Sequence, residues 1–322
     1  MISKIYPLQF TPILKERIWG GTKLKTLLNK SIHSDNVGES WEISTIDGDV
    51  SVVSNGVLAG KSLVDVIDSS PESILGTTVY KKFGNEFPLL FKYLDAQDDL
   101  SIQVHPNDEI AKKRHNSFGK TEMWYIMQAD PNARVIAGFN KKTNSEEFLE
   151  KIEDKQLLST LDSKTVSQGD VFFLETGIVH AIGAGIVIAE IQQTSDITYR
   201  LHDFDRKDEL GNERELHLDF ALDSINFEKV KVQKTYSKKI NQSNEMVDCP
   251  YFTTNFIPLD GNIEFIKNGK SFTVFMCVDG SFEIENEDFK CSYKTGDTVL
   301  IPAALKNFVI NGKASVLEIY IS

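Results

Sequence analysis

The chain has 322 residues, which is enough for one large domain or two ordinary ones with a sizeable core. Apolar residues make up 41% and charged residues 25%, which excludes a disordered chain or a low-complexity fibre. Lys and Arg number 35 against 47 Asp and Glu, giving a net charge of −12. We therefore expect binding to neither nucleic acid nor anionic membrane, and an anionic substrate would need a local cationic pocket.

Cysteine content and hydropathy bear on location. Cys249, Cys277 and Cys291 form no CxxC pair, and an odd number does not suit a disulfide scaffold. No run approaches 18 apolar residues, and residues 1–7 contain no apolar segment of the kind found in secretion signals. We expect a cytoplasmic protein without a membrane span.

Short runs rich in Val, Ile, Phe and Tyr, each bounded by Gly, Asp, Asn or Pro, predict strands along most of the chain, and fewer segments predict helices. In chain order we expect helices at 62–67 and 71–75, with Ser70 as the second cap, strands at 88–93 and 100–104, a helix at 107–114, a strand at 123–127, a helix at 145–161, strands at 171–174 and 186–191, a helix at 215–225, and strands at 252–257, 272–278, 298–301 and 316–321. This pattern predicts a mainly β sandwich or jelly roll with a few decorating helices.

Two features predict a division into two related units. Residues 229–239 carry five lysines, as an exposed connection or edge strand would, so we expect units at 1–235 and 236–322. The sequence GDVFFL at 169–174 resembles GDTVLI at 296–301, and IMQAD at 126–130 resembles FMCVD at 275–279. A strand pair repeated in this way indicates two copies of one β unit.

Polar residues alternate with apolar ones in the segment SIQVHPN at 101–107. On a strand, Ser101, Gln103 and His105 share one face while Ile102 and Val104 share the other. This is the pattern of a strand that lines a polar cavity.

Two further segments add candidate metal ligands. Lys120, Glu122 and Trp124 share a face of the next predicted strand, and Gly177 allows a turn that can present His180 inward. Any one of these residues alone would more often be structural. Two imidazoles, a carboxylate and the Gln103 amide together favour a site for Zn²⁺, Fe²⁺ or Mn²⁺.

The second copy of the repeat lacks this chemistry. Ala304 stands where Gly177 stands, Asn307 replaces His180, and Ser271 is expected opposite Glu122. We therefore expect a metal site in the first unit only, and a structural role for the second.

These segments resemble the type I mannose-6-phosphate isomerases of the cupin superfamily, in their short bacterial form. The resemblance rests on the second metal motif of cupins, in which Glu175 replaces the usual proline, on the highly specific SIQVHPN segment, and on ERIWGG at 16–21, GESWEIS at 38–44, FPLLFK at 87–92, GKTEMWYI at 119–126 and AEIQQTSDITYR at 189–200. Where longer members carry a histidine before the lysine, this chain has Gly119.

The resemblance implies two cupin-type jelly-roll units and a zinc-dependent aldose–ketose isomerase with one Zn²⁺ per chain. It implies interconversion of mannose 6-phosphate and fructose 6-phosphate through an enediol(ate). His105, Glu122 and His180 would be the metal ligands, with Gln103 as a fourth, and Arg200 would be catalytic. The expected substrate-binding residues are Ser101, Lys120, Glu190 and Asp196.

Several alternatives remain open at this stage. A metal-bound water, Glu190 and Asp196 are all candidate bases, and Arg200 could hold either the charged intermediate or the phosphate. A cupin that isomerises glucose 6-phosphate, an iron oxygenase with the same ligands, and a non-catalytic sugar-phosphate binder are the rival functions. The histidines that we expect not to bind zinc are His33, His115, His202 and His217.

Overall fold

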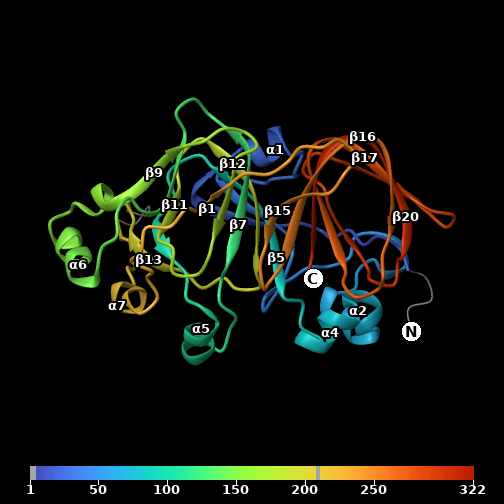
Figure 1. The fold of residues 1–322 in the computed structure, drawn as a ribbon, viewed down its shortest axis with the longest axis horizontal. Coiled ribbons are helices and arrows are strands. Elements are labelled where there is room, and N and C mark those ends of the chain that lie inside the picture. Colours follow the sequence, from blue (N-terminus) through green and yellow to red (C-terminus); the bar gives the residue numbers. More distant parts are fainter. Residues whose placement is uncertain (1–4, 208–210) are drawn as a thin grey trace.

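The computed structural model describes residues 5–207 and 211–322, so residues 1–4 of the N-terminal stretch considered above lie outside it. Figure 1 shows two β units side by side, with the first coloured from blue to yellow and the second from orange to red. The prediction of a mainly β protein built from two jelly-roll units is confirmed. All three cysteines are free. Within the described ranges, no helix is long and apolar enough to cross a membrane.

A seven-stranded sheet forms the larger layer of the first unit, and its neighbouring strands pair antiparallel. In spatial order its strands are β1 (Ile13–Gly21), β2 (Val37–Ile43), β5 (Leu89–Ala96), β12 (Ile186–Gln193), β7 (Glu122–Ala129), β10 (Val171–Leu174) and β14 (Gln233–Lys234). Strand β14, from the lysine-rich segment, pairs only with β10 and so lies at the sheet edge, as that segment predicted.

A five-stranded sheet faces it. In spatial order its strands are β13 (Tyr199–His202), β6 (Ile102–Val104), β11 (His180–Ile182), β8 (Arg134–Phe139) and β9 (Leu161–Thr165). Apolar side chains from both sheets form one buried cluster, in which Leu94 and Trp124 of the larger sheet join Val135 and Ile182 of the smaller. This sandwich encloses the candidate site.

The second unit is built around three long antiparallel strands that bend midway. Its strands are β15 (Asn244–Asp248), β16 (Thr253–Ile266), β20 (Asn307–Tyr320), β17 (Thr273–Glu285), β18 (Lys290–Lys294) and β19 (Thr298–Ile301), the last paired with β17. Gly261 and Gly312 are register partners at the bend, and both have positive φ. A Cβ on Gly312 would lie 2.5 Å from the Ser281 carbonyl oxygen, so only glycine fits this corner.

One apolar layer joins the two units. Met123, Tyr125 and Met127 alternate along β7 with the residues that face the sandwich interior, and they pack against the second unit. Tyr125 stacks on Phe256, with ring centroids 5.9 Å apart, and Phe87 contacts Phe272 at 4.8 Å. The seven-stranded sheet is therefore covered on both faces.

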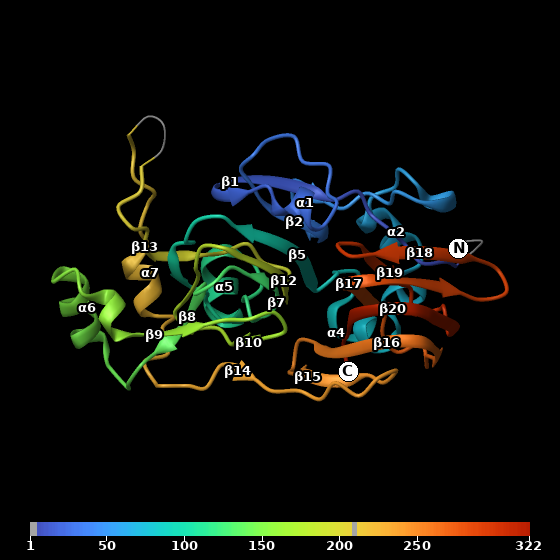
Figure 2. The same cartoon turned by 90° about the horizontal axis from the view of Figure 1, so that it is seen from above.

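Short helices decorate this framework. They are α1 (Lys23–Thr26), η1 (Gly56–Leu58), α2 (Leu63–Ser69), α3 (Pro71–Leu75), α4 (Thr77–Phe83), α5 (Asp108–His115), α6 (Ser145–Glu153), η2 (Leu157–Thr160) and α7 (Leu218–Leu222), and a two-stranded ribbon joins β3 (Thr45–Ile46) to β4 (Asp49–Val50). Helices α2 and α4 lie against the second unit in Figures 1 and 2, and Phe272 N donates to Leu75 O at 2.9 Å. The division at residue 235 stays a prediction, and elements from before it pack on the second unit.

Three helix predictions needed correction. The helix expected over 145–161 ends at Glu153, because Lys155 takes a positive φ of 56°, and residue 161 already begins β9. The helix expected over 215–225 shrinks to α7, because His217 N donates to Arg200 O and ties the preceding segment to β13. Ser70 makes no side-chain cap hydrogen bond to α3. Ser62 and Asn107 do cap their helices.

The register of the two units corrects one residue of the repeat. Leu174 of β10 lies opposite Glu122, and Ile301 of β19 lies opposite Thr273. Thr273 therefore takes the place of Glu122 in the second unit, and the expectation for Ser271 is wrong by two residues. A shift of two residues in the alignment of the two repeat copies leaves each side chain on the same face of its strand. The alternating pattern alone therefore did not reveal the shift.

Candidate metal centre and substrate cavity

The two histidines and the glutamate of the predicted site come together at one end of the sandwich. Glu122 begins β7, His180 begins β11, and His105 follows β6 directly. The turn at Gly177, with φ of 87°, brings its N–H to the His105 carbonyl oxygen at 3.0 Å. A Cβ on Gly177 would lie 2.6 Å from the Ser224 carbonyl oxygen, so the turn requires glycine.

The donor atoms of this group are close and buried. Glu122 Oε2 lies 3.4 Å from His105 Nε2, and Glu122 Oε1 lies 3.4 Å from His180 Nε2. All three ligand atoms lie within 4.8 Å of one another, and all three residues are buried. Among the described residues, this is the group of His, Cys, Asp or Glu side chains whose ligand atoms lie close enough together to hold a metal ion.

Backbone carbonyls fix the orientation of both imidazoles. His105 Nδ1 lies 2.9 Å from Ile197 O, and His180 Nδ1 lies 2.8 Å from Ile178 O. A carbonyl oxygen only accepts, so each Nδ1 carries the proton and each Nε2 presents a lone pair toward Glu122. Carbonyl-held imidazoles of this kind are typical of metal ligands.

The protonation states suit metal binding as well. Burial lowers the pKa of His105 to about 3 and also lowers the pKa of His180, so both rings are neutral. Burial acts to raise the pKa of Glu122, but the Lys120 ammonium, 3.4 Å away, holds it well below its usual range. Two neutral imidazoles beside a carboxylate form a donor set for a divalent cation.

Unpartnered polar atoms provide the test of fit. Both carboxylate oxygens of Glu122 and the Nε2 atom of His105 are buried without a hydrogen-bond partner among the described residues. Unpaired buried acceptors cost free energy, and three of them converging on one point are expected where an ion completes the site. The residues present therefore fit a divalent metal.

Gln103 adjoins this group, as predicted. It is the register partner of His180, and its side-chain amide nitrogen lies 3.3 Å from His180 Nε2. The Trp124 ring packs edge-on against His180, with ring centroids 5.4 Å apart. The Gln103 amide is thus within reach of an ion at the histidines.

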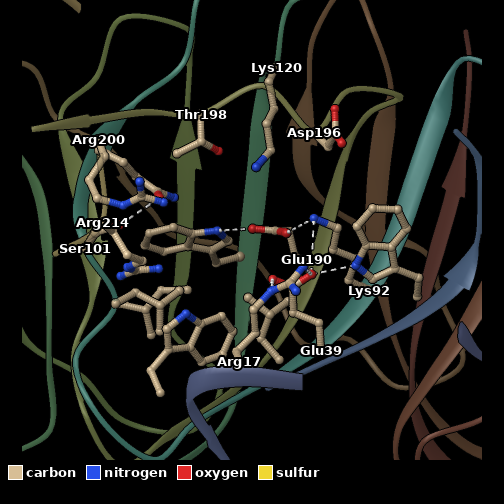
Figure 3. Close-up of a pocket in the computed structure, with 17 residues that line it drawn as sticks. Arg17, Glu39, Lys92, Ser101, Lys120, Glu190, Asp196, Thr198, Arg200 and Arg214 are labelled. Atoms are coloured by element: carbon tan, nitrogen blue, oxygen red, sulfur yellow. Dashed lines mark hydrogen bonds and ion pairs between the residues drawn. The ribbon is translucent and has the colours of Figure 1, made fainter. Parts of the chain in front are cut away.

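Figure 3 shows a cavity of about 410 Å³ whose lining includes Gln103, the register partner of His180, so the cavity adjoins the His–Glu–His group. It contains all five of the other predicted site residues, Ser101, Lys120, Glu190, Asp196 and Arg200. Its volume suits a phosphorylated hexose better than a macromolecular ligand. The remaining lining residues are Arg17, Trp19, Glu39, Trp41, Lys92, Leu94, Leu100, Gln103, Trp124, Ile182, Thr198 and Arg214.

Glu190 lies at the centre of the cavity in Figure 3, held from two sides. Its Oε1 accepts a hydrogen bond of 2.9 Å from Trp124 Nε1, and its Oε2 lies 3.4 Å from Lys92 Nζ. Burial raises the pKa of Glu190, and the charge of Glu122 raises it further. A positioned carboxyl group with a raised pKa is suited to proton transfer.

Lys120, Ser101 and Asp196 differ in exposure. Lys120 is buried and points into the cavity. Ser101 is buried as well, with its Oγ 3.5 Å from Gln103 Oε1. Asp196 is exposed and contributes to the cavity wall from its rim.

Arg200 lies beside the metal-binding group, because its register partner on β6 is Gln103. Its Nη1 donates to Glu215 O at 2.8 Å, and its buried Nε has no partner among the described residues. Within the described residues Asp203 forms its ion pairs with Arg206 and Arg214 and not with Arg200. Burial and the charge of Arg214 lower the pKa of Arg200.

Four charged cavity residues carried no predicted role: Arg17, Glu39, Lys92 and Arg214. Glu39 accepts from Arg17 Nε at 2.9 Å and from Trp41 Nε1, and although burial acts to raise its pKa, the Lys92 and Arg17 cations lower it to about 2. A signal existed for two of them, since Glu39 and Lys92 are charged residues within strands that are buried along their whole length. No local pattern marks Arg17 or Arg214.

The other histidines lie elsewhere. His33 is exposed, near Glu16, and His202 packs against Phe204. His115 lies 2.8 Å from the Tyr199 hydroxyl, and His217 Nδ1 accepts from Arg200 N at 3.1 Å.

Two jelly-roll units with one buried His–Glu–His group in the first define a two-domain cupin with a candidate metal centre. The family model for the type I phosphomannose isomerase catalytic domain matches residues 8–132, and that for the mannose-6-phosphate isomerase cupin domain matches residues 241–321.

Full-length relatives agree with these matches. The chain is 38% identical over 312 residues to the mannose-6-phosphate isomerase ManA of Bacillus subtilis, with 96% of each chain covered. It is 33% identical to a mannose-6-phosphate isomerase of Streptococcus mutans, with 97% of each covered. A crystal structure of a Bacillus subtilis mannose 6-phosphate isomerase superposes with a TM-score of 0.90 at 32% identity, covering 98% of this chain and 99% of that chain. The chain belongs to the type I phosphomannose isomerase family and is an isomerase.

Proposed function

We propose that this protein interconverts mannose 6-phosphate and fructose 6-phosphate through an enediol(ate), using one Zn²⁺ per chain. The observation that carries the proposal is a buried His–Glu–His group, with His105 Nε2 and both Glu122 oxygens lacking hydrogen-bond partners among the described residues, beside a hexose-sized cavity lined by cations and acids. Full-length relatives named as mannose-6-phosphate isomerases support the choice of substrate.

His105, Glu122 and His180 would hold the metal, with Gln103 as a fourth ligand once its amide oxygen turns toward the ion. Nitrogen and carboxylate donors suit zinc, and the nearly fully buried His and Glu side chains favour a tightly held ion. Bound there, a zinc ion supplies Lewis-acid polarisation of the sugar oxygens at C1 and C2.

Glu190 is the residue we assign to proton transfer. Its carboxylate takes the proton from C2 of the aldose and returns it to C1, while a second proton passes from the C2 hydroxyl to the oxygen on C1. The C2 hydroxyl thereby becomes the ketone, and the aldehyde becomes an alcohol. Its raised pKa brings it nearer neutrality, where a base is most effective, whereas Asp196 is exposed. Lys92 and Trp124 hold it in place.

Arg200 would stabilise the negative charge that develops on the enediolate oxygen. It is next to Gln103 in register, and its buried Nε is free of partners within the described residues. Lys120 and Ser101, both buried at the cavity, would bind sugar oxygens, and Asp196 would contact substrate from the rim.

The second unit, 236–322, would have a structural role and hold no metal. Thr273 and Asn307 stand where the first unit has Glu122 and His180. Three free cysteines suit the reducing cytoplasm. The net charge of −12 disfavours nucleic acid and anionic membranes as partners, so a small sugar phosphate remains the expected partner.

The test is a coupled assay of mannose 6-phosphate conversion before chelation, after chelation, and after reloading with Zn²⁺, Fe²⁺ or Mn²⁺. We expect chelation to abolish conversion and zinc to restore it. Full conversion by metal-free protein would overturn the metal assignment.

The same preparation separates the rival functions. Preference for glucose 6-phosphate would indicate a different isomerase, and oxygen uptake with iron would indicate an oxygenase. Tight substrate binding without turnover in zinc-loaded protein would indicate a binding protein. Each of these results would overturn the proposal.

A further inference from the structure

We infer that Arg214 is a substrate-binding residue that recognises the phosphate group, at the side of the cavity where it adjoins Arg200. The inference rests on the proposed function for the identity of the substrate. It is based on the position of Arg214, which lines the cavity although it comes from a different part of the sequence than strands β6, β7 and β11.

Asp203 fixes the Arg214 side chain. One carboxylate oxygen of Asp203 accepts from Arg214 Nε at 2.6 Å, and the other accepts from Nη2. Asp203 is almost fully buried, so this pairing holds the planar guanidinium in one orientation. Such a preorganised guanidinium suits the tetrahedral oxygens of a phosphate.

The segment that follows Arg214 is anchored to the site in the same way. Glu215 O accepts from Arg200 Nη1, and His217 exchanges hydrogen bonds with the backbone of Arg200. The charge of Arg214 contributes to the lowered pKa of Arg200, as expected for two guanidiniums that lie close together.

The charge balance differs between the two sides of the cavity. On one side Arg17 and Lys92 are matched by Glu39 and Glu190. On the other side, the guanidiniums of Arg200 and Arg214 line the cavity, and the carboxylate that pairs with Arg214, that of Asp203, is shared with Arg206, which lies outside the cavity lining among the described residues. Figure 3 shows Arg200, Arg214 and Ser101 together, away from Arg17, Glu39 and Lys92. An incoming dianion is therefore favoured at the Arg200–Arg214 side.

The arrangement also suits the length of the substrate. Arg200 lies next to Gln103 and so next to the metal-binding group, where C1 and C2 must react. The phosphate is at the opposite end of the hexose, on C6. Arg214, which adjoins Arg200 but comes from another segment, supplies a cation for that end.

Arg206 provides a matched control. It pairs with the same Asp203 carboxylate, but its guanidinium packs over the Phe204 ring and donates to the Asp99 carbonyl oxygen. It is absent from the cavity lining in the described structure. Replacing it removes an equivalent ion pair and leaves the cavity unchanged.

The experiment compares Arg214→Gln, Arg214→Lys and Arg206→Gln in zinc-loaded protein. The readouts are kcat and KM for mannose 6-phosphate, and the inhibition constant of inorganic phosphate. For Arg214→Gln we expect KM and the phosphate inhibition constant to rise together by roughly 10- to 100-fold, the usual effect of losing charged hydrogen bonds. Zinc content should be unchanged, Arg214→Lys should recover part of the loss, and Arg206→Gln should stay within about twofold of the wild type.

Wild-type KM and phosphate inhibition in folded Arg214→Gln protein would overturn the inference. An equal loss in Arg206→Gln would also overturn it, because the effect would then come through Asp203 and the fold. If Arg214→Gln does not fold, Arg214→Lys decides by the same two constants. If the wild type fails to convert mannose 6-phosphate, the proposed function fails, and calorimetric binding of phosphate to wild type and variants still tests Arg214.

Discussion

The two jelly-roll units share one turn with the same hydrogen bonds, yet among the described residues it is the first unit that carries a His–Glu–His group able to hold a metal. Gly169 N donates to Ile126 O at 2.8 Å, and Gly296 N donates to Cys277 O at 2.9 Å. The aspartate after each glycine then accepts a backbone N–H through its side chain, at 2.8 and 2.9 Å. The fold requires this turn in both units, so its retention says nothing about chemistry.

The side chains beyond the turn make the difference. Glu122 and His180 correspond to Thr273 and Asn307, and Asn307 is exposed at the start of β20. The strand partner of Asn307 is the exposed Ile266, where the first unit pairs His180 with Gln103. The two units thus have the same turn but different side chains at the candidate ligand positions. A cupin turn in a sequence therefore indicates the fold, and each candidate ligand position must be examined separately to infer a metal site.

The largest expected effect comes from giving the first unit the residue of the second. His180→Asn should remove stoichiometric zinc and lower kcat/KM by roughly 10³-fold or more, since Lewis-acid stabilisation amounts to several kcal/mol. Metal analysis and the coupled assay measure both. Full zinc content in this variant would contradict the ligand assignment.

Arg200 tests whether a residue of the first unit acts without binding metal. Arg200→Ala should lower kcat by roughly 10²-fold if the side chain stabilises charge only in the transition state. Zinc content should stay at the wild-type level, and Arg200→Lys should recover part of the rate because it lacks the planar fork. If KM of Arg200→Ala rises while kcat is unchanged, Arg200 binds the substrate in the ground state as strongly as in the transition state. An unchanged kcat/KM would show that Arg200 is not part of the active site.

Gln103 should contribute less than the histidines, because a neutral amide oxygen is the weakest of the proposed donors. Gln103→Ala is expected to weaken zinc affinity by roughly 10-fold while leaving a three-ligand site that still binds and turns over. Competition with a chelator of known affinity measures this. Complete loss of zinc would give Gln103 the same rank as His180.

The smallest effect should come from the reverse exchange in the second unit. Asn307→His adds an imidazole at an exposed position opposite Ile266, so we expect no additional zinc and a change in unfolding free energy within about 0.5 kcal/mol. Metal stoichiometry and thermal unfolding are the measurements. A second equivalent of tightly bound zinc would show that the second unit has kept a site.

Sequence alone predicted the residues that come together in the candidate metal site, because their pattern is local. Alternation along 101–105 places Gln103 and His105 on one face, and Gly177 accounts for the turn before His180. The strands at 171–174 and 298–301 were predicted to the residue, because a Gly–Asp pair marks each beginning and the runs are apolar apart from Thr298.

What sequence did not predict depends on pairings between distant segments. Arg17 and Glu39 meet because β1 pairs with β2, and Arg214 is held at the cavity by Asp203 and by the hydrogen bonds that tie Glu215 and His217 to Arg200. The overlong helix at 145–161 failed for a local reason, the positive φ of Lys155, which is uncommon for a lysine. The two-residue error at Ser271 arose because the two-residue period of a strand shows which face a side chain is on, but not which residue of the neighbouring strand it lies opposite.

The apolar layer between the units has a consequence for synthesis on the ribosome. The outer face of the seven-stranded sheet, with Met123, Tyr125 and Met127, is complete before the residues that cover it have been translated. At ordinary elongation rates the remaining 87 residues, 236–322, take roughly 4 to 17 s to make. Through that interval the nascent chain exposes an apolar sheet face, so its need for chaperones should be greatest late in translation. A chain that ends at residue 235 should aggregate rather than persist as an active fragment.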